Sequence, residues 1–304
     1  MHASVLKYFL EVARCGSVRK ASENLFVASS AVNRQILKLE EELGLELFDR
    51  LPGGMRLNTA GERLLKHVQE TLHDFQVTRA DLHALKGEHT GHIKIVAMDS
   101  MFEDVLPAAV EEFAELFPAV TYTLTSVAPM DAPAMVLSGQ ADAAVTFVSR
   151  LPPGVKTAAT VNLPLGVMMP PGHPLATRES ISLAECVGQP FLRSLGQPPI
   201  SSSMCPEFGD FWDQLEFTAT CNWTPTVKRL LMARLGISFF SKTAFIGELG
   251  RGELVWRPFE LPALRDLKVG IVVPAHRDLP AVTQNFIGRM ARRLKQVEAA
   301  AAAV

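Results

Sequence analysis

The chain has 304 residues, 48% of them hydrophobic and 20% charged, and its formal net charge at pH 7 is -2. This length exceeds one ordinary hydrophobic core, so we expect two or three globular domains. A near-neutral charge excludes a molecule that is basic throughout, and any contact with nucleic acid must come from a local patch. No apolar run reaches the roughly 20 residues of a bilayer crossing, and no signal peptide is expected. We therefore expect a cytoplasmic protein without membrane contact.

The four cysteines are Cys15, Cys186, Cys205 and Cys221, and they form neither a CxxC pair nor a metal-ligand spacing with histidine. We therefore expect reduced thiols at core or surface positions, with no bound metal and no other cofactor. A redox switch that joins Cys205 to Cys221 is the alternative.

Three short helices are predicted within residues 4–43, separated at Gly16 and at residues 26–28. Ser17 caps the second helix, Ser29 or Ser30 caps the third, and Gly44 ends the third. Hydrophobic side chains at steps of three and four residues give each helix one buried face. In the first two helices these side chains are Leu6, Phe9, Ala13, Val18, Ala21 and Leu25.

The third predicted helix has the residue types that recognise a DNA duplex. Its buried stripe consists of Val32, Ile36, Leu39 and Leu43, and its opposite flank is polar. Asn can pair with adenine and Arg with guanine through two hydrogen bonds each, while Ser and Lys hold phosphates. We therefore expect this flank to enter the major groove, through Ser29, Ser30, Asn33, Arg34 and Lys38.

Two short strands follow, over residues 47–50 and 56–58, and Leu51-Pro52-Gly53-Gly54-Met55 between them favours a hairpin turn. Three helices and a two-stranded ribbon predict a winged helix-turn-helix over residues 1–58. The wing would place Arg50 and Arg56 beside the phosphate backbone or the minor groove. Solvated surface arginines are the alternative.

Residues 59–86 predict one helix of about 42 Å, within a linker over residues 59–90. Thr59 and Glu62 have the spacing of a capping box. Apolar residues at steps of three and four, interrupted by Arg79, favour pairing with a second helix: Leu65, Val68, Leu72, Phe75 and Leu82. We expect a dimerisation arm that brings two reading heads to one face of DNA. Packing on its own domain is the alternative.

Residues 91–304 follow a polar hinge at residues 87–91 and alternate between strand and helix patterns. This alternation is typical of an α/β protein with parallel, doubly wound sheets. Two sets of elements predict two lobes, lobe I over about residues 91–161 and 268–297 and lobe II over about residues 162–267. The alanine-rich tail from Ala299 is expected to fray. Expected strands lie at residues 92–97, 120–126, 141–148, 165–169, 190–193, 217–222, 237–240 and 267–273.

One spaced block of residues comprises Ala21, Leu25, Val27, Ala31-Val32, Arg34-Gln35-Ile36, Leu39-Glu40, Leu43-Gly44 and Leu47-Phe48-x-Arg50. Weaker agreement continues at Thr59 and Gly61, at His173-Pro174-Leu175-Ala176 and at Arg234-Leu235-Gly236-Ile237. In these residues the chain resembles the LysR-type transcriptional regulators over nearly its full length. The resemblance implies a winged-helix DNA reader, a linker-helix dimer and a periplasmic-binding-protein-like effector domain. It also implies tetramers that bend promoter DNA, with RNA polymerase as a candidate partner.

Two positions on the reading face depart from the pattern of that family. The family usually has Gln or Pro where this chain has Ser29, and Ser where this chain has Asn33. A relative's operator sequence therefore does not transfer to this chain, and Asn33 favours readout of adenine at that point.

Ligands of two-lobed domains bind between the lobes, beyond the carboxyl ends of the strands. We expect the effector there, beside Asp99, Ser100, Met101, Ser126, Phe147, Leu195, Gly196 and Trp223. Relatives often have Ser or Thr at the position of Asp99, whereas a carboxylate would attract an amine or guanidinium. Asp99, followed by Glu103 and Asp104, thus predicts a small polar metabolite with a positive group. The alternative is that Asp99 only caps the helix that begins near Phe102.

An enzyme and a metabolite carrier are the rival interpretations. The sequence has no GxSxG, Walker A or HExxH motif and no GxGxxG after a strand, so we expect no catalytic residues. A metabolite carrier would explain the C-terminal two-thirds of the chain. It is disfavoured because no export signal is expected and because a carrier has no use for the predicted N-terminal DNA reader. We therefore expect a sequence-specific DNA-binding regulator whose promoter binding or bending responds to the effector.

Overall fold

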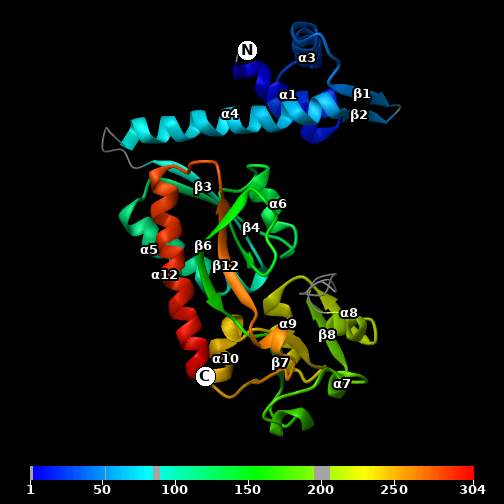
Figure 1. Ribbon diagram of the computed structural model, residues 1–304, viewed down its shortest axis with the longest axis vertical. Helices are drawn as coiled ribbons and strands as arrows, with labels where there is room; N and C mark the ends of the chain where they lie inside the picture. Colours follow the sequence, from blue (N-terminus) through cyan, green and yellow to red (C-terminus); the bar gives the residue numbers. More distant parts are fainter. Residues whose placement is uncertain (1–2, 52, 85–89, 195–205) are drawn as a thin grey trace. The chain divides into compact units, whose positions relative to one another are not determined.

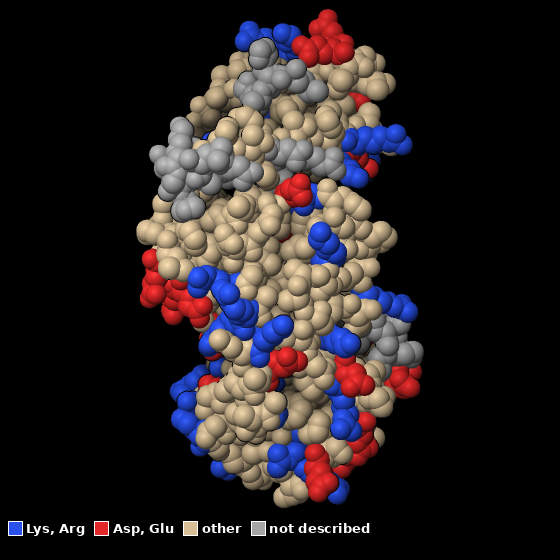
Figure 2. Space-filling view, turned by 60° about the vertical axis from the view of Figure 1, so that its left-hand side comes forward, with Lys and Arg blue, Asp and Glu red and all other residues tan. Residues whose placement is uncertain are grey.

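The computed structural model describes residues 3–51, 53–84, 90–194 and 206–304, and the chain forms two compact units, Met1–Leu82 and His83–Val304 (Figure 1). The first unit is a winged helix-turn-helix with a long helix, and the second is an α/β structure. Both basic and acidic side chains occur on the face that Figure 2 shows. None of the helices in the described residues is long and apolar enough to span a bilayer.

The first unit packs three helices and a hairpin against the first half of a long helix. Its elements are α1 (Ala3–Cys15), α2 (Val18–Leu25), α3 (Ser29–Leu43), β1 (Phe48–Leu51), β2 (Gly54–Leu57) and α4 (Thr59–Ala84). Strands β1 and β2 pair antiparallel. The buried core consists of Leu6, Phe9, Val12, Ala21, Val32, Ile36, Leu39, Leu47, Phe48 and Val68. The predicted winged helix-turn-helix is therefore confirmed.

Local signals set most helix ends in this unit. Gly16 and Gly44 have left-handed backbones, with φ of 62° and 67°, and Ser17 Oγ accepts a hydrogen bond from the Lys20 amide. The predicted cap of α3 is wrong, because Ala28 occupies the N-cap and no side chain caps that end. Leu43, predicted to be buried, is 41% exposed, because α3 extends beyond the core that buries Leu39.

The start of α4 also differs from the prediction. Asn58 Oδ1 accepts a hydrogen bond of 2.9 Å from the Gly61 amide, and the Asn58 amide donates to the Leu47 carbonyl at 3.1 Å. Asn58 thus caps α4, and the predicted capping box of Thr59 and Glu62 is wrong. A Cβ at Gly61 would lie 2.1 Å from the Leu47 carbonyl oxygen, so only glycine fits where the helix crosses the wing.

Lobe I of the second unit is a five-stranded sheet in the order β4-β3-β5-β12-β6. Its elements are β3 (Gly91–Ala97), η1 (Asp99–Phe102), α5 (Val105–Leu116), β4 (Val120–Ser126), α6 (Ala132–Leu137), β5 (Ala143–Phe147), β6 (Val155–Asn162), β12 (Lys268–Pro274) and α12 (Ala281–Ala303). Strand β3 runs parallel to β4 and β5, but β12 runs antiparallel to both β5 and β6. The sheet is therefore mixed, and the prediction of wholly parallel sheets is wrong.

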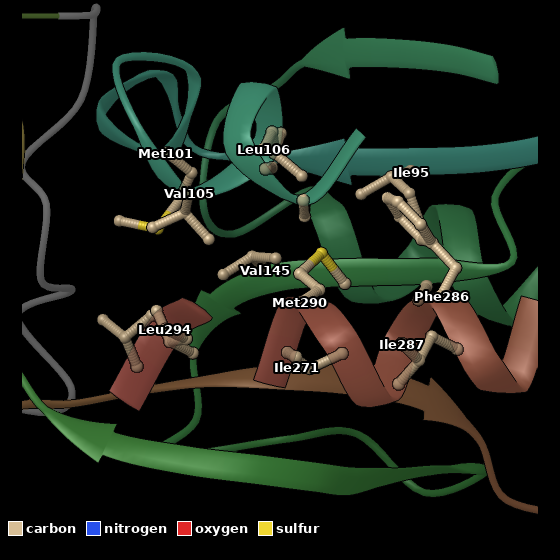
Figure 3. Close-up of a cluster of buried hydrophobic side chains, with 14 of the residues drawn as sticks. Ile95, Met101, Val105, Leu106, Val145, Ile271, Phe286, Ile287, Met290 and Leu294 are labelled. Carbon is tan, nitrogen blue, oxygen red and sulfur yellow. The ribbon is translucent and has the colours of Figure 1, made fainter. Parts of the chain in front are cut away.

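Helices cover both faces of this sheet. Helices α5 and α12 pack on the face that carries Ile95, Val145 and Ile271, where Phe286 and Phe113 meet with ring centroids 5.3 Å apart (Figure 3). Helix α6 covers the opposite face. The tail predicted to fray is instead the end of α12, which continues to Ala303 because its last turns still pack, with Ala301 only 8% exposed.

Lobe II consists of a three-stranded antiparallel sheet, β10-β7-β11, and a parallel pair, β8-β9. Its elements are β7 (Gly166–Met169), η2 (Pro174–Thr177), α7 (Leu183–Cys186), β8 (Phe191–Ser194), α8 (Pro206–Trp212), β9 (Phe217–Cys221), α9 (Thr224–Met232), β10 (Ser238–Phe240), η3 (Lys242–Phe245), α10 (Ile246–Gly250), β11 (Val255–Pro258) and α11 (Pro262–Arg265). A parallel bridge from Phe191 to Ile237 links β8 to the chain before β10. Hence β8, β9 and β10 point the same way and end at one edge.

Candidate DNA-binding and effector sites

The polar flank of α3 lies opposite the buried stripe of that helix. Val32, Ile36 and Leu39 are at most 1% exposed, whereas Ser30, Arg34 and Lys38 are exposed and Asn33 is half-buried. The structure therefore brings these four predicted reading residues together on one accessible side. Ser29 is exposed too, but its hydroxyl lies 2.6 Å from the buried Ser22 hydroxyl.

The predicted DNA-contacting cations of α3 and of the wing differ in whether an acidic side chain lies beside them. Arg34 and Arg50 have no carboxylate partner in the part of the chain that the structure describes. Arg56 faces Asp49 across the hairpin, with nitrogen and oxygen 3.6 Å apart. Lys38 lies 4.0 Å from Glu42. Arg34 and Arg50 are thus the cations best available to an anionic partner.

The turn between α2 and α3 has an exposed phenylalanine with a left-handed backbone that the sequence pattern did not predict. Phe26 ends α2 in a left-handed conformation, with φ of 53°, and its side chain is 95% exposed. A bulky residue in that conformation is strained. The residue type gives no signal for this backbone, since glycine is the usual residue in a left-handed conformation. Only the position of Phe26 at the end of α2 indicates it.

A charged network ties α1 to α2 beneath this turn. The hydrogen bond from Arg14, helped by hydrogen bonds from Asn24 and Cys15, lowers the pKa of Glu11 to about 2 against partial burial. The Asn24 side chain donates to Glu11 at 2.8 Å, which joins the end of α2 to α1. Burial and the nearby Glu11 raise the pKa of the Cys15 thiol.

The three acids that motivated the prediction of a positive effector all have partners within the chain. Asp99 Oδ2 accepts a hydrogen bond of 2.6 Å from the Thr224 hydroxyl. The Lys228 ammonium lies 2.7 Å from Glu103, and Arg293 binds both oxygens of Asp104 at 2.7 Å. Cations of the chain therefore neutralise two of the three carboxylates, and the acidic run is a weaker argument for an amine than its sequence suggested.

The alternative role of Asp99 as a helix cap is not observed for α5. That helix begins at Val105 with Asp104 at its N-cap. Asp99 instead begins η1, and its Oδ1 accepts a hydrogen bond of 2.9 Å from the adjacent Ser100 amide.

The other predicted effector residues lie in different surroundings. Ser126 and Trp223 are exposed, Ser100 is 8% exposed, and Phe147 packs against the cores of both lobes. Met101 is fully buried beside Val105 in the core of lobe I (Figure 3). Leu195 and Gly196 lie outside the described residues, as does Cys205. Thr224, which is not among the predicted effector residues although it is next to Trp223, is the residue that meets Asp99. The position of Thr224 as the first residue of α9, the helix that follows β9, is the sequence signal that could have placed it at the predicted site.

Three of the four cysteines lie in the described residues, and the alternative switch between Cys205 and Cys221 stays a prediction because Cys205 lies outside them. Cys15, Cys186 and Cys221 are free, and burial raises the pKa of the Cys186 thiol to about 12. Within the described residues, no group of three or more His, Cys, Asp and Glu side chains could hold a metal ion.

The chain is similar to known regulators in both units. A family model described as the LysR substrate binding domain matches residues 86–295, and one described as a bacterial regulatory helix-turn-helix protein of the lysR family matches residues 4–62. The transcriptional activator protein LysR of Escherichia coli is 24% identical over 94% of this chain and 91% of its own length. The RuBisCO operon transcriptional regulator of Allochromatium vinosum is 27% identical over 84% and 85%.

Solved structures show the same fold. A full-length OxyR variant from Pseudomonas aeruginosa matches with a TM-score of 0.68 at 20% identity, over 97% of this chain and 98% of its own. Full-length CbnR in complex with its target DNA matches with a TM-score of 0.56 at 18% identity, over 96% and 100%.

Proposed function

The chain belongs to the LysR family of DNA-binding transcriptional regulators, and from this premise we propose how it reads a promoter and how a small molecule changes its output. The domain limits we propose are residues 1–58 for reading DNA, 59–90 for the linker and 91–304 for binding the effector. The protein acts in the cytoplasm and carries out no catalysis of its own.

The observation that carries the proposal is the exposed Arg34 on the polar flank of α3. With the opposite stripe buried, this flank is the side of α3 free to enter a major groove. Arg34 and Asn33 read bases there, while Ser30 and Lys38 hold phosphates. Arg50 on the wing contacts the phosphate backbone or the minor groove, and Arg56, which already faces Asp49, contributes less.

Dimerisation through α4 is the second part of the proposal. Val68 packs into the winged-helix core, but Phe75 is 65% exposed and Leu82 is 56% exposed. Large apolar side chains at this spacing favour burial against the same helix of a second copy. Two reading heads then meet two half-sites, and pairs of dimers form the tetramer that bends promoter DNA and meets RNA polymerase.

The effector is a small polar metabolite bound between the lobes, near Asp99, Ser126 and Trp223. Asp99 favours a ligand that donates hydrogen bonds, such as an amine, although Thr224 already donates to it. The ligand changes the angle between the lobes, and thereby the spacing of the reading heads, by its differential affinity for the two arrangements.

A footprint on the DNA upstream of the coding region tests the proposal. We expect protection of a pseudo-palindrome whose half-sites lie about one helical turn, or a multiple of it, apart. Protein that prefers no promoter fragment over random duplex at moderate salt, with or without cell extract, would contradict it. A thermal-shift screen of metabolites identifies the effector, since a ligand at 100 times its Kd adds about 2.7 kcal/mol.

A further inference from the structure

Two side-chain bonds join the lobes of the second unit at one place. Lobe I contributes Asp99 and Glu103, at the start of η1 and just after its end, and lobe II contributes Thr224 and Lys228 from α9. The Thr224 hydroxyl donates to Asp99 at 2.6 Å, and the Lys228 ammonium donates to Glu103 at 2.7 Å. In each lobe the two residues are four positions apart, so one face of α9 is matched to one segment of lobe I.

The Lys228 ammonium is largely withdrawn from water. Its side chain is 12% exposed, and the carboxylates around it, Glu103 and Glu248, are 23% and 16% exposed. Glu248 accepts a second bond at 3.3 Å, and the Phe245 ring lies 5.3 Å from the ammonium. Removal of Lys228 would leave the largely buried Glu103 without its cation, which is far more costly than loss of an exposed pair.

Apolar contacts reinforce these bonds. Helix η3 of lobe II contacts η1 and α12 of lobe I. Ile246, the next residue of lobe II, packs against the core of lobe I, and Phe147 packs against both cores. The polar pair therefore lies within a continuous contact between the lobes.

We propose that Thr224–Asp99 and Lys228–Glu103 form a latch that holds the two lobes together through the chain's own side chains. Because these bonds need no small molecule, the latched arrangement is the resting state of the domain. A ligand that accepts a hydrogen bond from the Thr224 hydroxyl must take the proton that now goes to Asp99, so binding of such a ligand and release of the latch are linked. The free energy of the two latch bonds therefore sets how much more tightly an effector must bind the released arrangement than the latched one in order to shift the equilibrium between them.

Hydrogen exchange of the full-length protein, followed by mass spectrometry, tests the latch. In Lys228→Met and in Glu103→Gln, the segments of η1 and of α9 should both exchange at least about tenfold faster than in the wild type. The double variant should be no faster than the faster single variant, because both substitutions break the same bond between the lobes, that of Lys228 to Glu103. Glu253→Gln is the matched control: it removes an exposed pair with Arg251 inside lobe II and should leave both segments unchanged.

Thr224→Val is a second, nearly isosteric variant that decides the matter should Lys228→Met fail to fold. It removes only the hydroxyl that donates to Asp99, and the η1 and α9 segments should again respond together. Faster exchange in α9 while η1 keeps its wild-type rate, or no change in either segment, would overturn the latch. Neither result bears on promoter binding, which the footprint measures separately.

Discussion

The hydroxyl oxygens of Ser22 and Ser29 lie 2.6 Å apart across the turn between α2 and α3. Ser22 donates its own proton to the Arg19 carbonyl at 2.7 Å, so the proton between the two serines comes from Ser29. A phosphate oxygen only accepts hydrogen bonds, and Ser29 therefore has no proton left for one while it bonds to Ser22. We therefore expect Ser29 to fix the start of α3 and Ser30 to make the proposed phosphate contact.

Ser29→Ala should accordingly lower the free energy of unfolding by about 1 kcal/mol, with promoter affinity nearly unchanged. Ser30→Ala should instead weaken promoter binding and leave the free energy of unfolding nearly unchanged. Urea denaturation and fluorescence anisotropy on the same preparations separate the two quantities. A Ser29→Ala variant of wild-type stability that binds DNA more weakly would show that Ser29 turns to the phosphate.

Arg34→Ala should lose discrimination between operator and random duplex worth about 1–3 kcal/mol, because the proposed bidentate contact to guanine would be lost. Arg50→Ala should weaken all sequences alike and reduce the salt dependence of binding by about one counterion. Arg56→Ala should have a smaller effect than Arg50→Ala, since Asp49 already faces Arg56. Titrations against both duplexes at several salt concentrations give these values.

Arg265→Ala, which replaces an exposed arginine of the second unit, is the matched control for the loss of one positive charge. Its binding to both duplexes should equal that of the wild type. The assignment of the reading face would be wrong if Arg34→Ala and Arg50→Ala also kept wild-type footprints.

Local signals in the sequence were enough for the fold of the first unit and for several of its helix ends, whereas the second unit depended on distant partners. Gly16, Ser17 and Gly44 act on their own neighbours, so the ends they set were predictable. Asn58 was missed because Asn58 and Thr59 are both capping types, and the Leu47 carbonyl decides between them. The antiparallel direction of β12 follows from the return of the chain to lobe I after lobe II, which no local pattern shows. Strands β6 and β11 were not predicted, because their sequences have no strong alternation of polar and apolar residues.

The candidate sites show the same division. The reading face follows from residues within one helix, and the structure confirms that Arg34 and Lys38 are exposed there. The partners of Asp99 and Glu103 lie 125 positions away, which no pattern in one sequence reveals. The acidic run was therefore assigned to a ligand, although the cations for Glu103 and Asp104 are in the chain.

Phe26→Gly should stabilise the first unit by up to about 1 kcal/mol, because glycine adopts the left-handed backbone without a Cβ penalty. The side chain it removes is 95% exposed and contributes almost no burial. Thermal and urea unfolding measure the gain. Phe26→Ala is the matched control, since its Cβ keeps the strain, and it should show no gain. A loss of stability in Phe26→Gly alone would contradict the argument.

Glu11 should make the stability of the first unit depend on acid. Its pKa is lowered from an ordinary value of 4.5 to about 2, and the hydrogen bond from Arg14 is the largest cause. The folded form thus stays ionised below pH 4.5, where the unfolded chain takes up a proton. The stabilisation from Glu11 is complete above pH 4.5 and is lost as the pH falls towards about 2.

Glu11→Gln should therefore be less stable than the wild type near neutral pH, and the difference should shrink between about pH 5 and pH 3. Urea denaturation of both proteins at each pH measures the difference. Glu46→Gln is the matched control: Glu46 is exposed and has no ion pair within the described residues, so its curve should run parallel to that of the wild type. If the Glu11→Gln curve also ran parallel to the wild type, Arg14 and Asn24 would not hold this carboxylate in solution as they do in the structure.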